Sequence, residues 1–296
     1  FPFYHVVSGD PLPHVRHLYR QLDPEEFIRD LEGMAAVFQP VSLTEYLASL
    51  SPGGRAERRR RRMVLTFDDG LAQCHTVIAP ILREKGIPAT FFLNNRFLDE
   101  GGMFYRFKAS ILADTLLNDP SAAGPASGFL GIQQDQLYRA ILMIGGQQEV
   151  LLNSLAREMG VDFEAYQNHR PVYLQSGQVS ELMDWGFDVG GHSDDHTDFR
   201  ELDPEQMKAG VKESLRDLRK RFGAGVRTFS FPFTSDGVPR HVIESLLEGE
   251  EVAALLGTAG LKRTGNPRFI QRIPMEEYRA PAVAALKAEY LYYLLK

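Results

Sequence analysis

The sequence predicts an α/β protein in which strands and helices alternate, either as a wound parallel sheet or as a closed barrel. Short apolar segments recur along the 296 residues, and most are followed by a helical pattern after a short loop. The clearest unit is a strand over Met63–Phe67, a helix over Gln73–Lys85 and a strand over Ala89–Leu93. Such a βαβ unit implies two parallel strands joined by a right-handed crossover.

The N-terminal elements are bounded by their caps. Phe3–Val7 reads as a short buried strand, and a loop rich in Gly, Asp and Pro follows it. Asp23 is a good N-cap for a helix that begins with a proline and has an acidic first turn. A second helix begins at Ser42, because Glu45 completes a capping box, and the turn residues Ser51–Gly54 end it.

The region from about residue 101 to residue 178 interrupts this alternation. It holds three helical patterns, at Lys108–Leu117, Asp135–Ile144 and Val150–Met159. A loop rich in Ser, Ala, Gly and Pro is expected at Asn118–Gly128. We therefore expect a mostly helical insertion within a single domain of residues 1–296. A lid over a site and simple padding of the scaffold are both compatible with this pattern.

After the insertion the alternation resumes. The expected helices cover Val179–Trp185, Pro204–Phe222 with Asp203 as its N-cap, Val242–Leu247 and Ala282–Leu295. The expected strands cover Phe187–Gly191, Arg227–Phe231, Val252–Leu256 and Phe269–Ile273.

The composition is that of an ordinary globular protein. Hydrophobic residues make up 44% and charged residues 24%, enough apolar material for a sizeable core. A net charge of -6 gives no global attraction to nucleic acid, and Cys74, the single cysteine, cannot form an intrachain disulfide. We interpret the basic run Arg58–Arg62 as a solvated loop, with contact to an acidic glycan or a membrane surface as the alternative.

Two adjacent carboxylates follow the strand Met63–Phe67. In β/α folds the C-terminal ends of the strands carry the active site, and Asp68 and Asp69 stand at that point, before Gly70. Two neighbouring acids repel each other unless a cation or hydrogen bonds offset their charge. An Asp-Gly turn without a chemical role is the plain alternative.

Two of the eight histidines follow the strand Phe187–Gly191. His192 and His196 are four residues apart, so both imidazoles would lie on one face if a helical turn begins there. Gly190 and Gly191 would let the backbone come close to such a site. The alternative is that these are two unrelated surface histidines. It is the weaker interpretation, because the i, i+4 pair stands directly after a strand.

Together the two motifs predict a metal centre. Two histidines and one carboxylate are a common ligand set for catalytic zinc, with one position left for water. The metal would lower the pKa of that water to about 7 and polarise a carbonyl. The second aspartate would then serve as general base, a combination that suits hydrolysis of an amide or an ester.

These residues resemble the motifs of the polysaccharide deacetylases, also called carbohydrate esterase family four or the NodB-homology domain. Thr66-Phe-Asp-Asp-Gly70 is similar to the first motif of that family, and His192-Ser-Asp-Asp-His196 is similar to the second. Phe229-Ser-Phe-Pro-Phe233 occupies the place of the third. Weaker likenesses occur at Tyr4-His5, Pro40–Leu43, Ile87–Phe92 and Arg272-Ile-Pro274. The resemblance covers most of the chain outside the insertion.

The resemblance implies a distorted (β/α) barrel with seven strands and the removal of acetyl groups from N-acetylated sugars of a polysaccharide. Asp68 would match the general base, with metal-bound water as the nucleophile. The metal ligands would be Asp69, His192 and His196. The backbone N–H of Phe233 would match the donor that stabilises the oxyanion.

Two positions depart from the family pattern. An arginine that orients the base often begins the third motif, and Ser230 holds that place here. The Leu-x-His that supplies the catalytic acid has no clear match, because no histidine lies beyond His241. His5 is the most favourable replacement as proton donor, ahead of His17 and His75.

Some residues are candidates for contact with the substrate. They are His5, Ser230, Asp236 and Tyr105. Asp236 would also suit the role of the group that orients the base. Tyr105 and Phe107 would stack on sugar rings and line a cleft. Trp185 stands at helical spacing from Leu182, so we expect it in the core.

The sequence therefore predicts a metal-dependent carbohydrate deacetylase whose partner is an acetylated glycan. Zinc is the expected metal, and cobalt, nickel and iron also suit the ligand set. One alternative function is an O-acetyl esterase or another amide or formyl hydrolase that acts on a carbohydrate. A glycan-binding protein on the same fold, without catalysis, is the other.

The sequence is compatible with more than one cellular compartment. No segment reaches the roughly 18 consecutive apolar residues of a membrane span, and no signal peptide is visible. The sequence begins at Phe1 and not at Met, which is compatible with a leader or membrane anchor ahead of it. The resemblance favours the cell envelope or the extracellular space and allows membrane association, with the cytoplasm as the alternative.

Overall fold

The computed structural model describes residues 1–50, 61–223 and 225–295, and the chain forms two compact units. The barrel unit comprises residues 1–7, 22–99 and 173–296, and the helical unit comprises residues 8–21 and 100–172. The predicted turn at Ser51–Gly54 and most of the basic run Arg58–Arg62 lie outside the described residues.

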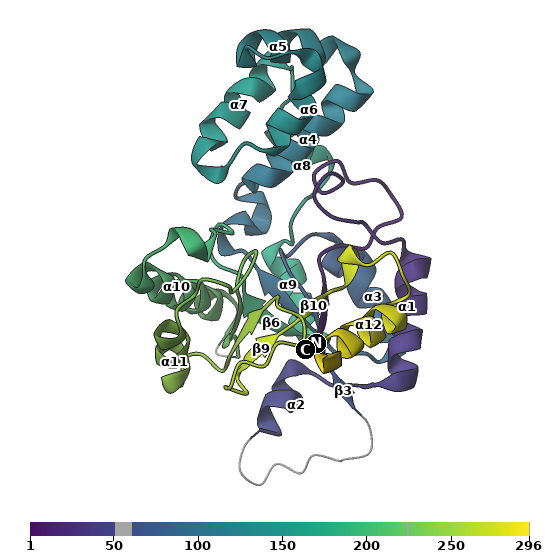
Figure 1. Ribbon diagram of the computed structural model, residues 1–296, viewed down its shortest axis with the longest axis vertical. Helices are drawn as coiled ribbons and strands as arrows, with labels where there is room; N and C mark the ends of the chain where they lie inside the picture. The colour runs from purple at the N-terminus through teal and green to yellow at the C-terminus, as the bar shows by residue number, and fades with distance from the viewer. Residues whose placement is uncertain (51–60, 224, 296) are drawn as a thin grey trace. The chain divides into compact units, whose positions relative to one another are not determined.

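A parallel sheet of eight strands forms the centre of the barrel unit (Figure 1). The strands are β1 (Pro2–Tyr4), β4 (Leu65–Phe67), β5 (Ala89–Leu93), β6 (Asp188–Gly191), β7 (Thr228–Ser230), β8 (Ala254–Gly257), β9 (Phe269–Gln271) and β10 (Ile273–Pro274). They are ordered β10-β1-β4-β5-β6-β7-β8-β9, and each neighbouring pair is parallel. The sheet is nearly closed, which confirms the predicted distorted (β/α) barrel.

The sheet has eight strands, whereas seven were predicted. The expected strand Phe269–Ile273 is divided at Arg272, so that β9 pairs with one edge of the sheet and β10 with the other. The Arg272 N–H donates to the Gly257 carbonyl at 3.1 Å, and the next N–H, of Ile273, donates to the Phe1 carbonyl at 2.8 Å. Successive residues thus bond to opposite edges, and one segment nearly closes the barrel.

Helices cover the outside of the sheet. They are α1 (Pro24–Val37), α2 (Leu43–Ala48), α3 (Ala79–Lys85), α9 (Ser176–Asp184), α10 (Pro204–Phe222), α11 (Arg240–Glu248) and α12 (Ala282–Leu295). Figure 1 shows α1, α3 and α12 on one side of the barrel and α10 and α11 on the other. None of the helices in the described parts of the chain is long and apolar enough to cross a membrane.

The predicted caps form in the structure. The side chains of Asp23, Ser42 and Asp203 each accept a hydrogen bond from the first turn of their helix, and Ser42 and Glu45 form the complete capping box. A π-helical turn, Cys74–Ile78, precedes α3. The short strands β2 (Gln39–Pro40) and β3 (Arg62–Met63) pair separately from the barrel.

Alternate residues of β5 face two different layers of the core. Phe91 and Leu93 pack in the larger cluster, beneath the helices. Phe92, between them, packs in a smaller cluster with Leu256 of β8 and Ile270 of β9. Because β5 is not a neighbour of β8 or β9 in the sheet, this smaller cluster fills the interior of the barrel.

The helical unit has its own core. Its helices are α4 (Tyr105–Asn118), α5 (Ala123–Leu130), α6 (Gln134–Leu142), α7 (Glu149–Glu158) and α8 (Phe163–His169). The segment of residues 8–21 belongs to this unit, where the Ser110 hydroxyl donates to the Pro13 carbonyl at 2.5 Å.

The predicted loop Asn118–Gly128 is wrong in its second half, which begins α5. Ala126 of this helix is fully buried, and α5 packs against α6 and α7. Tertiary packing therefore outweighs the low helix propensity of Gly124 and Gly128.

Candidate metal centre and active site

Reactive side chains follow the C-terminal ends of several barrel strands. His5 follows β1, Asp68 and Asp69 follow β4, His192 follows β6 and Glu276 follows β10. Because the strands are parallel, these ends meet at one edge of the barrel.

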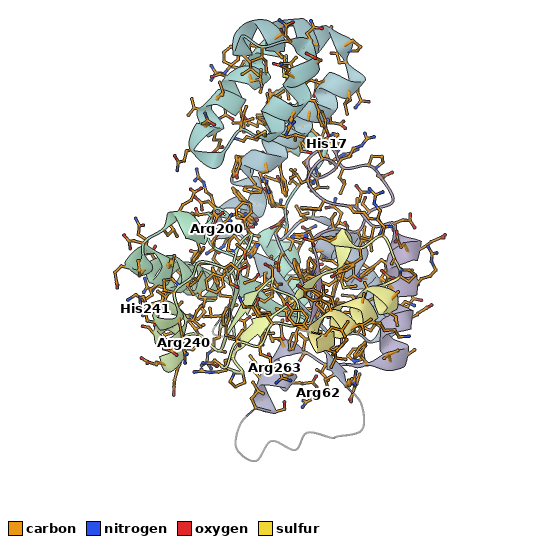
Figure 2. All side chains as sticks on the ribbon, viewed as in Figure 1. His17, Arg62, Arg200, Arg240, His241 and Arg263 are labelled. Carbon is orange, nitrogen blue, oxygen red and sulfur yellow. The ribbon has the colours of Figure 1, made fainter. Side chains whose placement is uncertain are left out.

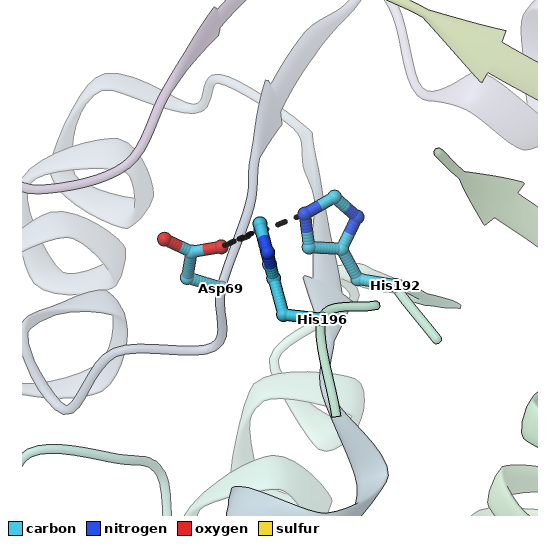
Figure 3. A group of neighbouring side chains, drawn as sticks. All are labelled: Asp69, His192 and His196. Atoms are coloured by element: carbon cyan, nitrogen blue, oxygen red, sulfur yellow. Dashed lines mark ion pairs between the residues drawn. The ribbon is translucent and has the colours of Figure 1, made fainter. Parts of the chain in front are cut away.

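Asp69, His192 and His196 point toward one another (Figure 3). Oδ1 of Asp69 lies 3.5 Å from Nε2 of His192 and 3.2 Å from Nε2 of His196. One ligand atom from each of the three residues lies within 4.8 Å of the others. In a tetrahedral zinc site, bonds of about 2.1 Å place neighbouring ligand atoms about 3.4 Å apart. The three side chains therefore fit one divalent metal ion.

The segment that carries the two histidines is a loop and not the helical turn that the sequence suggested. Ser193 and His196 have positive φ angles of 68° and 61°. These left-handed residues fold the loop so that the rings of His192 and His196 lie 4.9 Å apart. The two histidines thus lie together as the i, i+4 spacing suggested, but the loop brings them together and no helical turn does.

The two glycines before His192 allow close packing inside the barrel. They were expected to let the backbone come close to the metal centre, but the atoms that crowd them belong to neighbouring strands and to α10. A Cβ atom on Gly190 would lie 2.8 Å from the Thr228 carbonyl and would overlap the Phe92 ring. A Cβ atom on Gly191 would lie 2.8 Å from the Ser214 hydroxyl. Strand β6 therefore needs glycine at both positions to pack against its neighbours.

The protonation states of the three residues suit metal binding. Nδ1 of His192 donates to the Ser230 carbonyl at 2.8 Å, which leaves Nε2 as a ligand atom. Burial opposes ionisation of Asp69, but its bonds to His192 and His196 outweigh it and hold the pKa of Asp69 well below its usual value. Burial lowers the pKa of His196, so that ring is neutral. An ionised carboxylate and neutral imidazoles are the forms that bind metal.

A buried arginine binds the other aspartate. Nη1 of Arg272 donates to Oδ1 of Asp68 at 2.8 Å, and Nη2 donates to Oδ2 at 2.7 Å. Burial would raise the pKa of Asp68, but the charge of Arg272 outweighs it and lowers that pKa. Asp68 is therefore ionised at neutral pH, with Oδ2 3.9 Å from Nε2 of His192.

Ser230 and Thr66 complete this buried polar layer. Arg272 donates to the Ser230 hydroxyl at 2.6 Å and to the Thr66 hydroxyl at 2.9 Å, and Ser230 in turn donates to Asp68 at 3.2 Å. The sequence suggested that Ser230 contacts the substrate, but its side chain is fully buried and faces Asp68 and Arg272. The guanidinium expected at position 230 is thus supplied by Arg272, from the junction of β9 and β10.

His5 forms a pair with Glu276. Nδ1 of His5 lies 2.5 Å from Oε2 of Glu276, while Oε1 accepts the N–H groups of His5 and Val6 at 2.6 and 3.1 Å. The His5 side chain is 21% exposed, whereas that of Glu276 is 3% exposed. Burial disfavours the imidazolium, but the Glu276 carboxylate outweighs burial and raises the pKa of His5 to about 9. At neutral pH His5 is therefore protonated and partly exposed.

The loop after β7 carries Phe233 and Asp236. Phe233 has a positive φ of 56°, and its ring stands edge-on to that of His196 with centroids 4.6 Å apart. Its carbonyl accepts a hydrogen bond from the Thr258 hydroxyl at 3.2 Å. Asp236 lies three residues further and pairs with Lys262 at 3.4 Å.

Three other candidates lie in the helical unit. Phe107 is 1% exposed in the core of that unit, so the expected stacking on a sugar ring is wrong for this residue. Tyr105 packs beside Gly146, where an added Cβ would lie 3.1 Å from its ring. Nε2 of His17 lies 3.2 Å from Asp114.

His75 lies on the outside of the barrel unit. Its ring stacks on Trp185 with centroids 5.0 Å apart, and Nε2 lies 2.8 Å from Glu181. Trp185 is partly buried against the main core, as its helical spacing predicts.

Sequence reasoning missed the parts played by Arg272 and Glu276. A signal was present for Arg272, since a charged residue between apolar positions of a strand indicates a buried partner. Nothing in the spacing pointed to Asp68 as that partner, and Glu276 carried no signal beside its neighbour Glu277.

Comparison with known proteins gave one family and a set of related folds. The family model described as polysaccharide deacetylase matches residues 55–246, more than half of the chain. A comparison with curated proteins found no match.

Several solved structures have the same fold. The Streptococcus pyogenes deacetylase PplD, solved with acetate, has a TM-score of 0.61 at 14% identity, over 96% of this chain and 95% of its own. A de-N-acetylase from Aggregatibacter actinomycetemcomitans has a TM-score of 0.58 at 14% identity, over 96% and 98%. IcaB from Ammonifex degensii has a TM-score of 0.56 at 16% identity, over 97% and 99%. At these identities the likeness shows the fold.

Proposed function

The chain belongs to the polysaccharide deacetylase family, and on that basis we propose that it is a metal-dependent hydrolase that removes acetyl groups from N-acetylated sugars of a polysaccharide. The observation that carries the proposal is the arrangement at one edge of the barrel. A three-residue metal-binding cluster, Asp69, His192 and His196, lies next to Asp68, an ionised aspartate that Arg272 holds in place.

Asp69, His192 and His196 would hold the metal, and their two nitrogens and one oxygen favour zinc. A bound zinc ion would act as a Lewis acid that makes water more acidic and polarises the acetyl carbonyl. Cobalt, nickel and iron suit the same ligands, and their availability decides which one is bound.

Asp68 is the proposed general base. Its carboxylate is ionised, and its two oxygens are oriented by Arg272 and Ser230, so it can take a proton from the attacking water. The contact with Arg272 lowers the pKa of Asp68 and so makes it a weaker base, but the same contact fixes the geometry of the carboxylate. The backbone N–H of Phe233 is the proposed donor to the oxyanion that forms when water adds to the carbonyl.

His5 is the proposed general acid. An amide nitrogen leaves only if it gains a proton, and the imidazolium of His5 carries one at neutral pH. Glu276 acts through His5 by holding Nδ1, so we describe Glu276 as a positioning residue. This pair supports N-deacetylation over ester cleavage, because an alkoxide needs less help from an acid.

The proposal is tested by measuring acetate release from matched N-acetylated and O-acetylated glycans. The samples are zinc-loaded protein, metal-stripped protein and the zinc-loaded Asp68→Asn variant. Release from N-acetylated glycans that requires both zinc and Asp68 is the expected result. Release only from O-acetylated glycans would replace the amide substrate with an ester. Tight glycan binding without release at full metal loading would point to a binding protein.

We further propose that the protein works at the cell envelope or outside the cell, in keeping with its family. Acetylated polysaccharides are the substrates expected there. Fractionation of cells that express the full-length natural protein, followed by immunodetection in each fraction, tests this location.

A further inference from the structure

The barrel unit contains a cavity of about 680 Å³. Its walls come from the loop after β7, the first turn of α11 and the loop that joins β8 to β9. Both loops begin at the C-terminal ends of their strands, the edge of the barrel that also carries the metal cluster.

Cationic side chains predominate in this cavity. They are Arg240, Lys262, Arg263 and Arg268, against the carboxylates of Asp236 and Glu244. Figure 2 labels Arg240 and Arg263 on the barrel unit. The first turn of α11 adds the positive end of a helix that has no side-chain cap.

The carboxylates do not neutralise the cavity. Lys262 pairs with Asp236 at 3.4 Å, but both side chains are more than 60% exposed, so water screens the pair and a ligand can exchange with it. Arg240 pairs with Glu244 at 2.7 Å. In the described part of the chain, Arg263 makes no hydrogen bond or ion pair. The cavity thus keeps cationic groups available to an anion.

A short loop connects the cavity to the metal cluster. The Phe233 ring lies against His196, and Asp236, three residues later, lines the cavity. Three residues of extended chain span at most about 10 Å. The Thr258 hydroxyl donates to the Phe233 carbonyl, which holds the two loops together. The Asp236 side of the cavity therefore lies within about 10 Å of Phe233 along the backbone, a distance on the scale of a short oligosaccharide.

We propose that this cavity binds an anionic group, a carboxylate or a phosphate, on a sugar residue close to the residue that is deacetylated. The proposal rests on the proposed function and deepens it, because it assigns the substrate to the acidic glycans. A neutral glycan would gain little from the exposed cationic side chains of Lys262 and Arg263, whereas an acidic one replaces part of their hydration with charge-assisted hydrogen bonds.

The kinetic test compares the protein with the double variant Lys262→Gln/Arg263→Gln. Both side chains are exposed, and neither belongs to the core. Arg268 is left unchanged because its guanidinium donates to the Leu247 carbonyl and supports the fold. The matched control is Arg29→Gln on α1, whose side chain is 66% exposed and pairs only loosely with Glu25 at 3.8 Å.

The substrates are three N-acetylglucosamine oligosaccharides of equal length. One is neutral, one alternates with glucuronate and one carries a 6-phosphate on the neighbouring residue. For the unchanged protein we expect a KM about tenfold lower for at least one acidic substrate than for the neutral one. The double variant should lose this advantage in KM and keep kcat, while the control retains both. The substrate with the larger advantage identifies carboxylate or phosphate. Equal KM values for all three substrates, unchanged in the double variant, would overturn the proposal.

A binding test separates this proposal from the proposed function. Metal-stripped protein is titrated with an oligogalacturonate, which carries carboxylates and no acetyl group, and with phosphorylated chitosan oligosaccharide. Calorimetry should detect binding that salt weakens and that the double variant weakens about fivefold or more. Such binding without acetate release from any glycan, at confirmed zinc loading, would overturn the proposed function and keep the anionic site. Acetate release without oligogalacturonate or phosphate binding, and without a preference for acidic substrates, would overturn the anionic site and keep the proposed function.

Discussion

Arg272 holds both carboxylate oxygens of Asp68, although the two residues lie 204 positions apart in the chain. The guanidinium is fully buried, lies over the Phe3 ring at 4.3 Å and bonds to the hydroxyls of Ser230 and Thr66. Asp68 follows β4, whereas Arg272 separates β9 from β10. The ion pair therefore ties the closing segment of the barrel to the proposed base.

Removing the guanidinium should destabilise the fold and disable the base. In Arg272→Met, Asp68 stays buried without its partner, so we expect the free energy of unfolding to fall by about 3–5 kcal/mol. Urea denaturation at pH 7 measures this loss. Arg272→Lys keeps a charge without the bidentate geometry and should fold better while losing most of the acetate release. Arg279→Met, an exposed control, should change stability by less than about 0.5 kcal/mol. Equal stability of Arg272→Met and this control would contradict the prediction.

Asp68→Asn should separate metal binding from turnover. Asparagine keeps the shape of the side chain but cannot accept the proton of water, so acetate release should fall by about 10²–10⁴-fold. Zinc content, measured by mass spectrometry of the purified protein, should not change, because Asp68 is not among the three ligands. Full turnover in this variant would rule out Asp68 as the base.

Zinc should stabilise the protein through Asp69, His192 and His196. A ligand that binds only the folded state adds about 4 kcal/mol at a thousandfold excess over its Kd. We expect zinc to raise Tm of the stripped protein and to have no such effect on Asp69→Ala, His192→Ala or His196→Ala. His241→Ala, an exposed histidine on α11, is the control and should respond like the unchanged protein. A normal zinc response in all three ligand variants would place the metal elsewhere.

The His5–Glu276 pair should make stability depend on pH. The folded-state pKa of His5 is about 9 and its ordinary value is 6.5, so the folded protein binds this proton more tightly. The stabilisation is therefore complete below about pH 6.5 and is lost as the pH rises through 9, with a magnitude of about 3 kcal/mol.

Glu276→Gln tests this pair in metal-stripped protein. Glutamine can still accept the two backbone N–H groups, but it removes the charge that holds the proton on His5. The difference in unfolding free energy between the two proteins should be largest below pH 6.5 and should shrink towards pH 9. NMR titration should show a lower pKa for His5 in the variant. Glu277→Gln, an exposed neighbour, should leave both measurements unchanged, and a pH-independent difference for Glu276→Gln would refute the coupling.

Gly190→Ala should disturb both the barrel and the metal cluster. The new methyl group would overlap the Phe92 ring and lie 2.8 Å from the Thr228 carbonyl, so β6 must shift. We expect a loss of about 1–3 kcal/mol in the free energy of unfolding, together with weaker zinc binding, because His192 is two residues away. Gly210→Ala is the matched control, since a methyl group there meets only the Phe199 ring at 3.8 Å in a helix. That variant should be as stable as the unchanged protein or more so.

Local patterns in the sequence predicted most of the elements and the three residues that form the metal-binding candidate cluster. Asp23, Ser42 and Asp203 cap their helices as predicted, because capping depends on residues a few positions apart. Asp69, His192 and His196 could be predicted to lie together because each follows a recognisable strand, and parallel strands bring their C-terminal ends together.

Only the tertiary structure decided what surrounds those three residues. The pairing of Arg272 with Asp68, and of Glu276 with His5, joins residues more than 200 positions apart, and no local periodicity encodes such a contact. The loop geometry at His192–His196 depends on two left-handed residues that are not glycine, which the surrounding packing must hold in place. Sequence patterns determine neighbours along the chain, whereas the closure of the barrel determines which charges meet inside it.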